Sequence, residues 1–124
     1  MTIVTSIEAP AAVGPYSQAI LSNGLVFVSG QIPLSPETGK LAAGGIKEQA
    51  EQAIQNLKAV LISAGSSLDL VVKTTCFLAD MDDFDAFNEV YAKHFVGRPA
   101  RSCVAASALP RGAMVEIEAI AEIA

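Results

Sequence analysis

The sequence predicts a mixed α+β fold in which two helices pack on one face of a mixed sheet, in the order hairpin, helix, strand, helix, hairpin. Three observations predict it. Asn23-Gly24 separates two apolar runs, the segment from Ile46 to Ala64 has apolar residues at helical spacing, and Leu70 to Ala79 is rich in Val, Thr and Phe. The chain has 124 residues, so we expect one domain spanning 1–124.

The first predicted element is a β-hairpin. Gly14-Pro15 is expected to open an early strand, and the runs Gln18–Leu21 and Leu25–Ser29 flank Asn23-Gly24. Both central residues of a tight hairpin turn need positive φ, which Asn and Gly adopt readily. The polar, turn-rich stretch from Pro33 to Gly45 then predicts a loop.

The helix predicted after this loop has its apolar residues on one side and its charged residues on the other. Gly65 follows it as a C-terminal cap glycine would. The apolar side consists of Ile46, Ala50, Ala53, Ile54, Leu57, Val60, Leu61 and Ala64. A long strand over Leu70 to Ala79 comes next, because β-branched and aromatic residues favour strands.

The second half of the chain predicts a second helix and two strands. Asp82 or Asp83 can cap this helix. Its apolar stripe is Phe84, Phe87, Val90, Tyr91 and Phe95. Strands are expected from Arg101 to Ala106 and from Met114 to Ile123, and the turn around Pro110 to Gly112 should join them as a hairpin. We expect the sheet face away from the helices to be covered by other subunits.

The composition also predicts association with other copies of the chain. Hydrophobic residues make up 52% of the sequence and charged residues only 17%, whereas the usual charged share is about 25%. A small domain has a high ratio of surface to volume and cannot hide so much apolar surface alone. A homo-oligomer is therefore expected.

Charge and motifs disfavour several classes of partner. The net charge is −5 and no basic run occurs, which disfavours nucleic acid. No apolar stretch is long enough to span a membrane, and Met1 to Ala12 does not resemble a signal peptide.

The two cysteines, Cys76 and Cys103, are expected to be reduced thiols, which fits a cytoplasmic location. The single histidine, His94, is expected to be a surface or cap residue, and one histidine excludes a multi-histidine metal site. No P-loop and no dinucleotide-binding pattern occur, so no cofactor is predicted.

Candidate chemistry lies in polar residues on apolar strands. Side chains alternate along a strand, so Arg101 and Cys103 share one face, and Glu116 and Glu118 share a face of the last strand. Burying such charges is costly unless they are paired or used. The pattern fits a structural pair between Arg101 and a glutamate, a solvated sheet face, or a functional site. Periodicity does not choose between Glu116 and Glu118.

Four segments resemble the signature segments of the Rid (YjgF) family, in the family's order and at nearly its spacing. They are Ala9–Ala19 (APAAVGPYSQA), Val28–Pro33 (VSGQIP), Pro99–Val104 (PARSCV) and Val115–Ala121 (VEIEAIA). Val72–Thr75 and Phe84–Tyr91 also match, so the resemblance covers essentially the whole chain. Two departures, the short connection from Tyr91 to Pro99 and the apolar stretch from Ala105 to Ala108, concern the rim of the expected pocket and bear on the substrate range.

The resemblance implies a chorismate-mutase-like α+β fold and a homotrimer with three pockets between neighbouring subunits. It implies metal-free hydrolysis of 2-iminobutanoate and 2-iminopropanoate, which pyridoxal-phosphate dehydratases release, to 2-keto acids and ammonia. By the same resemblance, Arg101 holds the substrate carboxylate, the backbone of Cys103 lines the pocket, and Glu116 positions the attacking water. Tyr16, Ser29, Gly30 and Asn88 match pocket-lining positions.

Plainer interpretations of these residues stay open at this point. Tyr16 could anchor a turn, Ser29 and Gly30 could end a strand, Cys103 could serve packing, and Asn88 could face solvent. Two other functions also fit the pattern. One is a trimer that binds small carboxylates or keto acids without converting them, because Arg101 suffices for binding. The other is ribonuclease or translation-inhibiting activity, which fits the acidic chain badly.

Overall fold

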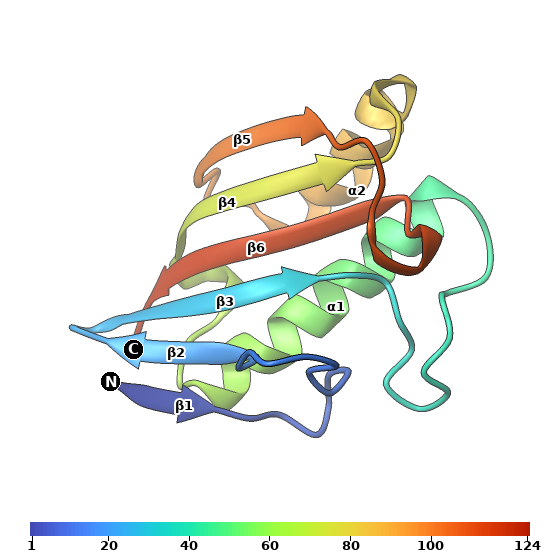
Figure 1. Cartoon of the computed structure of the whole chain (residues 1–124). Coiled ribbons are helices and arrows are strands. Elements are labelled where there is room, and N and C mark those ends of the chain that lie inside the picture. The colour runs from blue at the N-terminus through green and yellow to red at the C-terminus, as the bar shows by residue number, and fades with distance from the viewer.

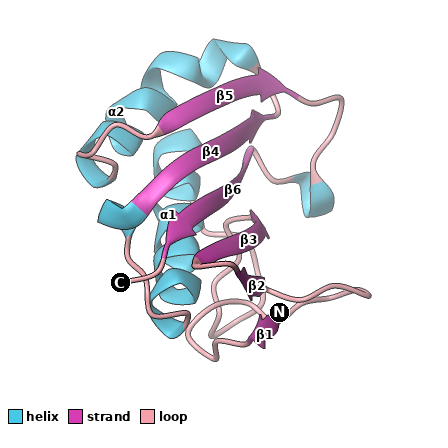
Figure 2. Cartoon of the chain, turned by 90° about the vertical axis from the view of Figure 1, so that its left-hand side faces the viewer, coloured by secondary structure: helices cyan, strands magenta, loops and turns pink.

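The computed structural model describes residues 1–124 and contains one six-stranded sheet in the order β1-β2-β3-β6-β4-β5 (Figure 1). Both helices lie on the same side of this sheet (Figure 2), so the predicted α+β class and layer arrangement are confirmed. The elements are β1 (Thr2–Val4), β2 (Ala19–Ser22), β3 (Leu25–Gln31), α1 (Ile46–Ser63), β4 (Val71–Leu78), α2 (Phe84–His94), β5 (Ala100–Ala105) and β6 (Val115–Glu122).

The N-terminal hairpin is confirmed, although its surroundings differ from expectation. Strands β2 and β3 pair antiparallel across Asn23 and Gly24, which have φ values of 52° and 77°. Gly14-Pro15 does not open a strand, because β2 begins only at Ala19. The loop before β2 is held by Gln18, whose amide accepts from the Ser6 backbone N–H at 2.6 Å and donates to the Ser6 carbonyl at 3.1 Å.

The expected C-terminal hairpin is wrong. Strand β5 pairs parallel with β4, whereas β6 lies between β3 and β4 and is antiparallel to both. The connection from β4 through α2 to β5 is therefore a strand–helix–strand crossover, which brings parallel strands side by side. Strand β6 has Val115, Ile117, Ala119 and Ala121 buried under the helices and suits a central position. Strand β5 is left at the edge of the sheet.

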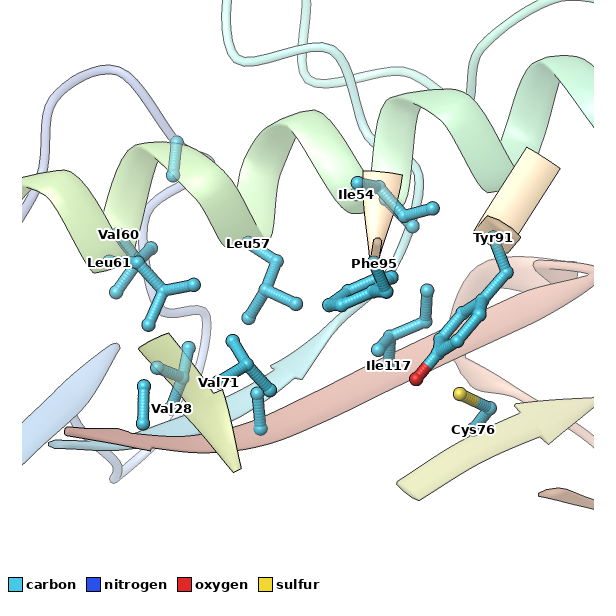
Figure 3. Close-up of a cluster of buried hydrophobic side chains, with 14 of the residues drawn as sticks. Val28, Ile54, Leu57, Val60, Leu61, Val71, Cys76, Tyr91, Phe95 and Ile117 are labelled. Carbon is cyan, nitrogen blue, oxygen red and sulfur yellow. The ribbon is translucent and has the colours of Figure 1, made fainter. Parts of the chain in front are cut away.

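The hydrophobic core fills the space between the helices and the sheet (Figure 3). Ile54, Leu57 and Leu61 of α1 are fully buried, as the helical spacing predicted. Gly65 follows α1 at φ 80°, a conformation that glycine adopts without strain. The predicted stripe of α2 is also confirmed, with Phe87 fully buried.

The structure corrects two expectations about α2, one for its N-terminal cap and one for His94 at its C-terminal end. Asp83 is the N-cap of α2 but its side chain makes no cap hydrogen bond. Asp80 instead caps the short turn that precedes the helix, accepting from the Asp82 N–H at 2.8 Å. At the other end, His94 is not simply a surface residue, because its Nε2 lies 2.8 Å from Glu51 Oε1 and links α2 to α1.

The face of the sheet away from the helices is partly apolar and uncovered. Phe27, Val72 and Val104 are 42%, 40% and 48% exposed, respectively. Neither helix combines the length and the apolar character that crossing a membrane would require. The open face is the surface that the sequence predicts to be covered by other subunits.

Candidate functional site

Arg101 lies half-buried on β5 with its guanidinium among aromatic rings of α2. The guanidinium carbon is 4.7 Å from the centroid of the Tyr91 ring and 5.6 Å from that of Phe84. These are cation–π distances. Nη1 donates to Oδ1 of Asn88 at 2.9 Å. Asn88, Tyr91 and Arg101 line one cavity of about 630 Å³.

No carboxylate neutralises this arginine. The two ion pairs of the structure join Lys47 to Glu89 and His94 to Glu51. The structural pair between Arg101 and a glutamate, which the sequence left open, is therefore absent. A half-buried guanidinium whose partners are an amide and aromatic rings retains free donors for an anion, and its planar fork matches a carboxylate.

Cys103 follows Arg101 on the same face of β5 and packs against the core. Burial raises the pKa of its thiol, and the Arg101 charge opposes that shift only in part. Burial likewise raises the pKa of Cys76, its neighbour on β4, to about 12. Both thiols are thus protonated at neutral pH, which disfavours a thiolate nucleophile here.

Glu116 lies in a second cavity, of about 470 Å³, on the open side of the sheet. Tyr16, Ser29, Gly30 and Glu118 also line it. Other lining residues are Val13, Ile32, Pro110 and Arg111. The predicted residues at the N-terminal end of the chain therefore gather around Glu116.

A β-bulge shapes this second cavity. Val28 pairs with Ala119 and Gln31 with Ile117, so the two residues Ser29 and Gly30 lie opposite the single residue Glu118. A Cβ at position 30 would overlap the Glu116 carboxylate, so only glycine allows this close approach. The Ser29 hydroxyl donates to the carbonyl of Ser17 at 2.6 Å and so fixes the loop that carries Tyr16.

The environment of Glu116 favours its protonated form. Burial raises the pKa of the Glu116 carboxyl, and the nearby Glu118 charge raises it further. Glu118 lines the same cavity but is exposed. Glu116 is thus the more buried of the two carboxyls, and a pKa raised toward neutrality suits a general base.

Arg101 and Glu116 lie on opposite faces of the sheet. Arg101 is in register with Thr74, which is fully buried on the helix side and bonds the Tyr91 hydroxyl at 2.8 Å. Glu116 is in register with Phe77, and Phe77 with Val104, on the open side. Within one chain the structure therefore brings Arg101, Cys103 and Asn88 together and, separately, Tyr16, Ser29, Gly30 and Glu116.

The sequence did not reveal that aromatic rings of α2 contact the Arg101 guanidinium in the first cavity. The sequence predicts Tyr91 only as part of the apolar stripe of α2, yet its ring faces the guanidinium. A hydroxyl within an otherwise apolar stripe was the available signal, since buried tyrosines usually bond their hydroxyl. The chain has no cluster of three or more His, Cys, Asp or Glu side chains that could hold a metal ion.

The family model described as Endoribonuclease L-PSP matches residues 6–123. A mouse (Mus musculus) protein named 2-iminobutanoate/2-iminopropanoate deaminase is 49% identical over 120 residues, which cover 96% of this chain and 89% of the mouse protein. The human protein of the same name is 44% identical over 120 residues, covering 96% of this chain and 88% of the human protein.

Solved structures of relatives have the same fold. Escherichia coli TdcF, solved with bound serine, aligns over 100% of both chains with a TM-score of 0.95 at 39% identity. The Escherichia coli YjgF gene product aligns over 98% of both chains with a TM-score of 0.93, also at 39% identity.

Proposed function

The chain belongs to the Rid (YjgF) family, and from that premise we propose that it hydrolyses reactive 2-imino acids in the cytoplasm. The substrates are 2-iminobutanoate and 2-iminopropanoate, and the products are 2-keto acids and ammonia. The observation that carries this proposal is the half-buried Arg101 guanidinium, which faces a cavity without any carboxylate partner. The whole chain, 1–124, acts as one domain of this type.

Arg101 grips the carboxylate of the imino acid with two charge-assisted hydrogen bonds. Asn88 already accepts from one guanidinium nitrogen and orients the fork. The rings of Tyr91 and Phe84 fix the plane of the guanidinium. Fixing the carboxylate also fixes C2 of the substrate, and such orientation lowers the barrier without a cofactor.

Glu116 accepts a proton from the attacking water while the water oxygen forms a bond to C2 of the substrate. The C=N electron pair moves to nitrogen, which takes up the proton now held by Glu116. In the resulting tetrahedral adduct the hydroxyl proton passes to nitrogen, the C–N bond breaks, and ammonia leaves the keto acid. General bases typically contribute about 10²–10⁴-fold. Free imines already hydrolyse in water, so an enhancement of this size is sufficient.

Because Arg101 and Glu116 lie on opposite faces of the sheet, one site that uses both residues is built from two protomers. The group of Arg101, Cys103 and Asn88 comes from one protomer, and the group containing Glu116 comes from its neighbour. Strand β5 is an edge strand and Val104 and Phe27 are exposed, so the sheet offers the surface for this contact. A closed ring of three such contacts gives a homotrimer with three composite sites.

Gly30→Ala is expected to lower kcat for 2-iminobutanoate hydrolysis by about 10²-fold, within the range of a displaced general base. The added methyl group overlaps the Glu116 carboxylate and forces it from its position. Gly24→Ala is the matched control, because a Cβ at Gly24 meets no atom within 4 Å, although its positive φ makes the turn less stable. Equal kcat losses in the two variants would contradict this role of Gly30.

The proposal is tested directly by a coupled assay. Threonine dehydratase generates 2-iminobutanoate in place, and the release of 2-oxobutanoate is followed with and without the protein. Faster release that scales with protein concentration supports the proposal. An unchanged rate across a range of protein concentrations would contradict it.

A second candidate function is capture of small carboxylates without turnover. The structure of the relative TdcF with bound serine favours it, because serine is a small molecule with a carboxylate. Calorimetry with 2-oxobutanoate separates the two functions when combined with the assay above. Binding without any acceleration of imine hydrolysis would assign the chain to this second function.

A further inference from the structure

The cavity around Arg101 contains a second arginine. Arg98 lines the same space of about 630 Å³ and lies three residues before Arg101, in the connection between α2 and β5. The eight lining residues include no aspartate or glutamate. In a chain with net charge −5, this cavity therefore carries two positive charges and no negative one.

Arg98 is exposed at the rim of this cavity, in the turn that follows α2. Its φ is 53°, a left-handed conformation that non-glycine residues seldom adopt. The Arg98 N–H donates to the Phe95 carbonyl at 3.1 Å, which closes the turn after α2. Pro99 follows and restricts the chain further. The geometry of this turn thus determines the direction in which the Arg98 side chain leaves the backbone, and no side-chain partner contributes.

Neither arginine is committed to another charge. The ion pairs of the structure involve Lys47 and His94, and Arg98 makes no side-chain hydrogen bond. Residues three apart along an extended chain are at most ~10 Å apart at their Cα atoms. Two arginine side chains that start at this separation can bind the two ends of one short dianion. The bound dianion also reduces the repulsion between the two guanidinium groups.

We propose that Arg98 is a specificity residue that extends the site to 2-imino acids whose side chain carries a second carboxylate. Arg101 holds the carboxylate next to the imine carbon, and Arg98 holds the one at the far end. This inference rests on the proposed function, because it takes Arg101 as the substrate clamp. It adds dicarboxylic 2-imino acids as a substrate class for the same cavity.

The test compares binding of 2-oxoglutarate and 2-oxobutanoate, a dicarboxylic and a monocarboxylic keto acid, to the assembled protein by calorimetry. Wild type is expected to bind 2-oxoglutarate about tenfold more tightly, as one added charge-assisted hydrogen bond provides. Arg98→Asn should remove that preference and change 2-oxobutanoate affinity by less than about twofold. Asparagine is neutral and tolerates positive φ, so the turn is retained.

Lys93→Gln is the matched control, because it removes one positive charge from α2 outside the cavity. It should keep the preference for 2-oxoglutarate. Equal wild-type affinities for the two keto acids would overturn the inference, as would an equal loss in Lys93→Gln. Turnover of 2-iminobutanoate is measured on the same protein. Turnover without the preference overturns this inference alone. The absence of imine turnover overturns the proposed function and, with it, the extension to dicarboxylic imino acids.

Discussion

Arg101→Ala is expected to lower kcat/KM for 2-iminobutanoate hydrolysis by about 10²–10³-fold. In the proposed function, the guanidinium supplies two charge-assisted hydrogen bonds to the substrate carboxylate, each worth about 1.5–3 kcal/mol and not fully additive. Without the guanidinium, C2 of the substrate is no longer positioned next to the attacking water. The steady-state rate with freshly generated imine measures this loss.

The same variant should remain folded and assembled. The Arg101 guanidinium is half-buried and has no carboxylate partner, so its removal leaves no charge uncompensated. Size-exclusion chromatography and thermal unfolding check this point. Arg101→Lys is the informative companion, because it keeps the charge but lacks the planar fork, and should recover only part of the activity. Full turnover in Arg101→Ala would contradict the assignment of the carboxylate clamp.

Glu116→Gln is expected to lower kcat by about 10²–10⁴-fold, the usual contribution of a general base. It should also raise the melting temperature slightly at neutral pH. Burial and Glu118 raise the pKa of Glu116 in the folded protein, so its ionised form opposes folding above the ordinary glutamate pKa of about 4.3. Glutamine removes that unfavourable charge while keeping the shape of the side chain.

The pH profile separates a base from a merely structural residue. Because the pKa of Glu116 is raised, activity should fall on acidification at a pH above the ordinary glutamate value. Glu118→Gln removes the neighbouring charge and should move this acid limb to lower pH. A Glu116→Gln variant with wild-type kcat and an unchanged acid limb would show that Glu116 is not the base.

The elements that depend on local sequence could be predicted, and the strand order could not. Asn23-Gly24 and the spacing from Ile46 to Ala64 act within a few residues of each other, so the hairpin and α1 were foreseen. The position of β6 between β3 and β4 depends on pairings between residues such as Phe77 and Glu116, far apart in sequence. Proximity in sequence favoured pairing with β5 instead.

The same limit applies to the site. Alternation along β5 correctly placed Arg101 and Cys103 on one face. It did not reveal that Glu116 lies on the other face, because that depends on the register across β4. The role of Tyr91 beneath the guanidinium was equally hidden, since a contact between α2 and the edge strand follows from the crossover connection.

The composite site is tested most directly by mixing two defective variants. Arg101→Ala and Glu116→Gln subunits, carrying different tags, are co-expressed, and assemblies containing both tags are purified for the imine assay. A site that joins Arg101 of one protomer to Glu116 of the next recovers roughly a third of wild-type activity, because every mixed ring of three contains one site in which both halves are intact. Mixed assemblies no more active than either variant alone would contradict a site shared between protomers.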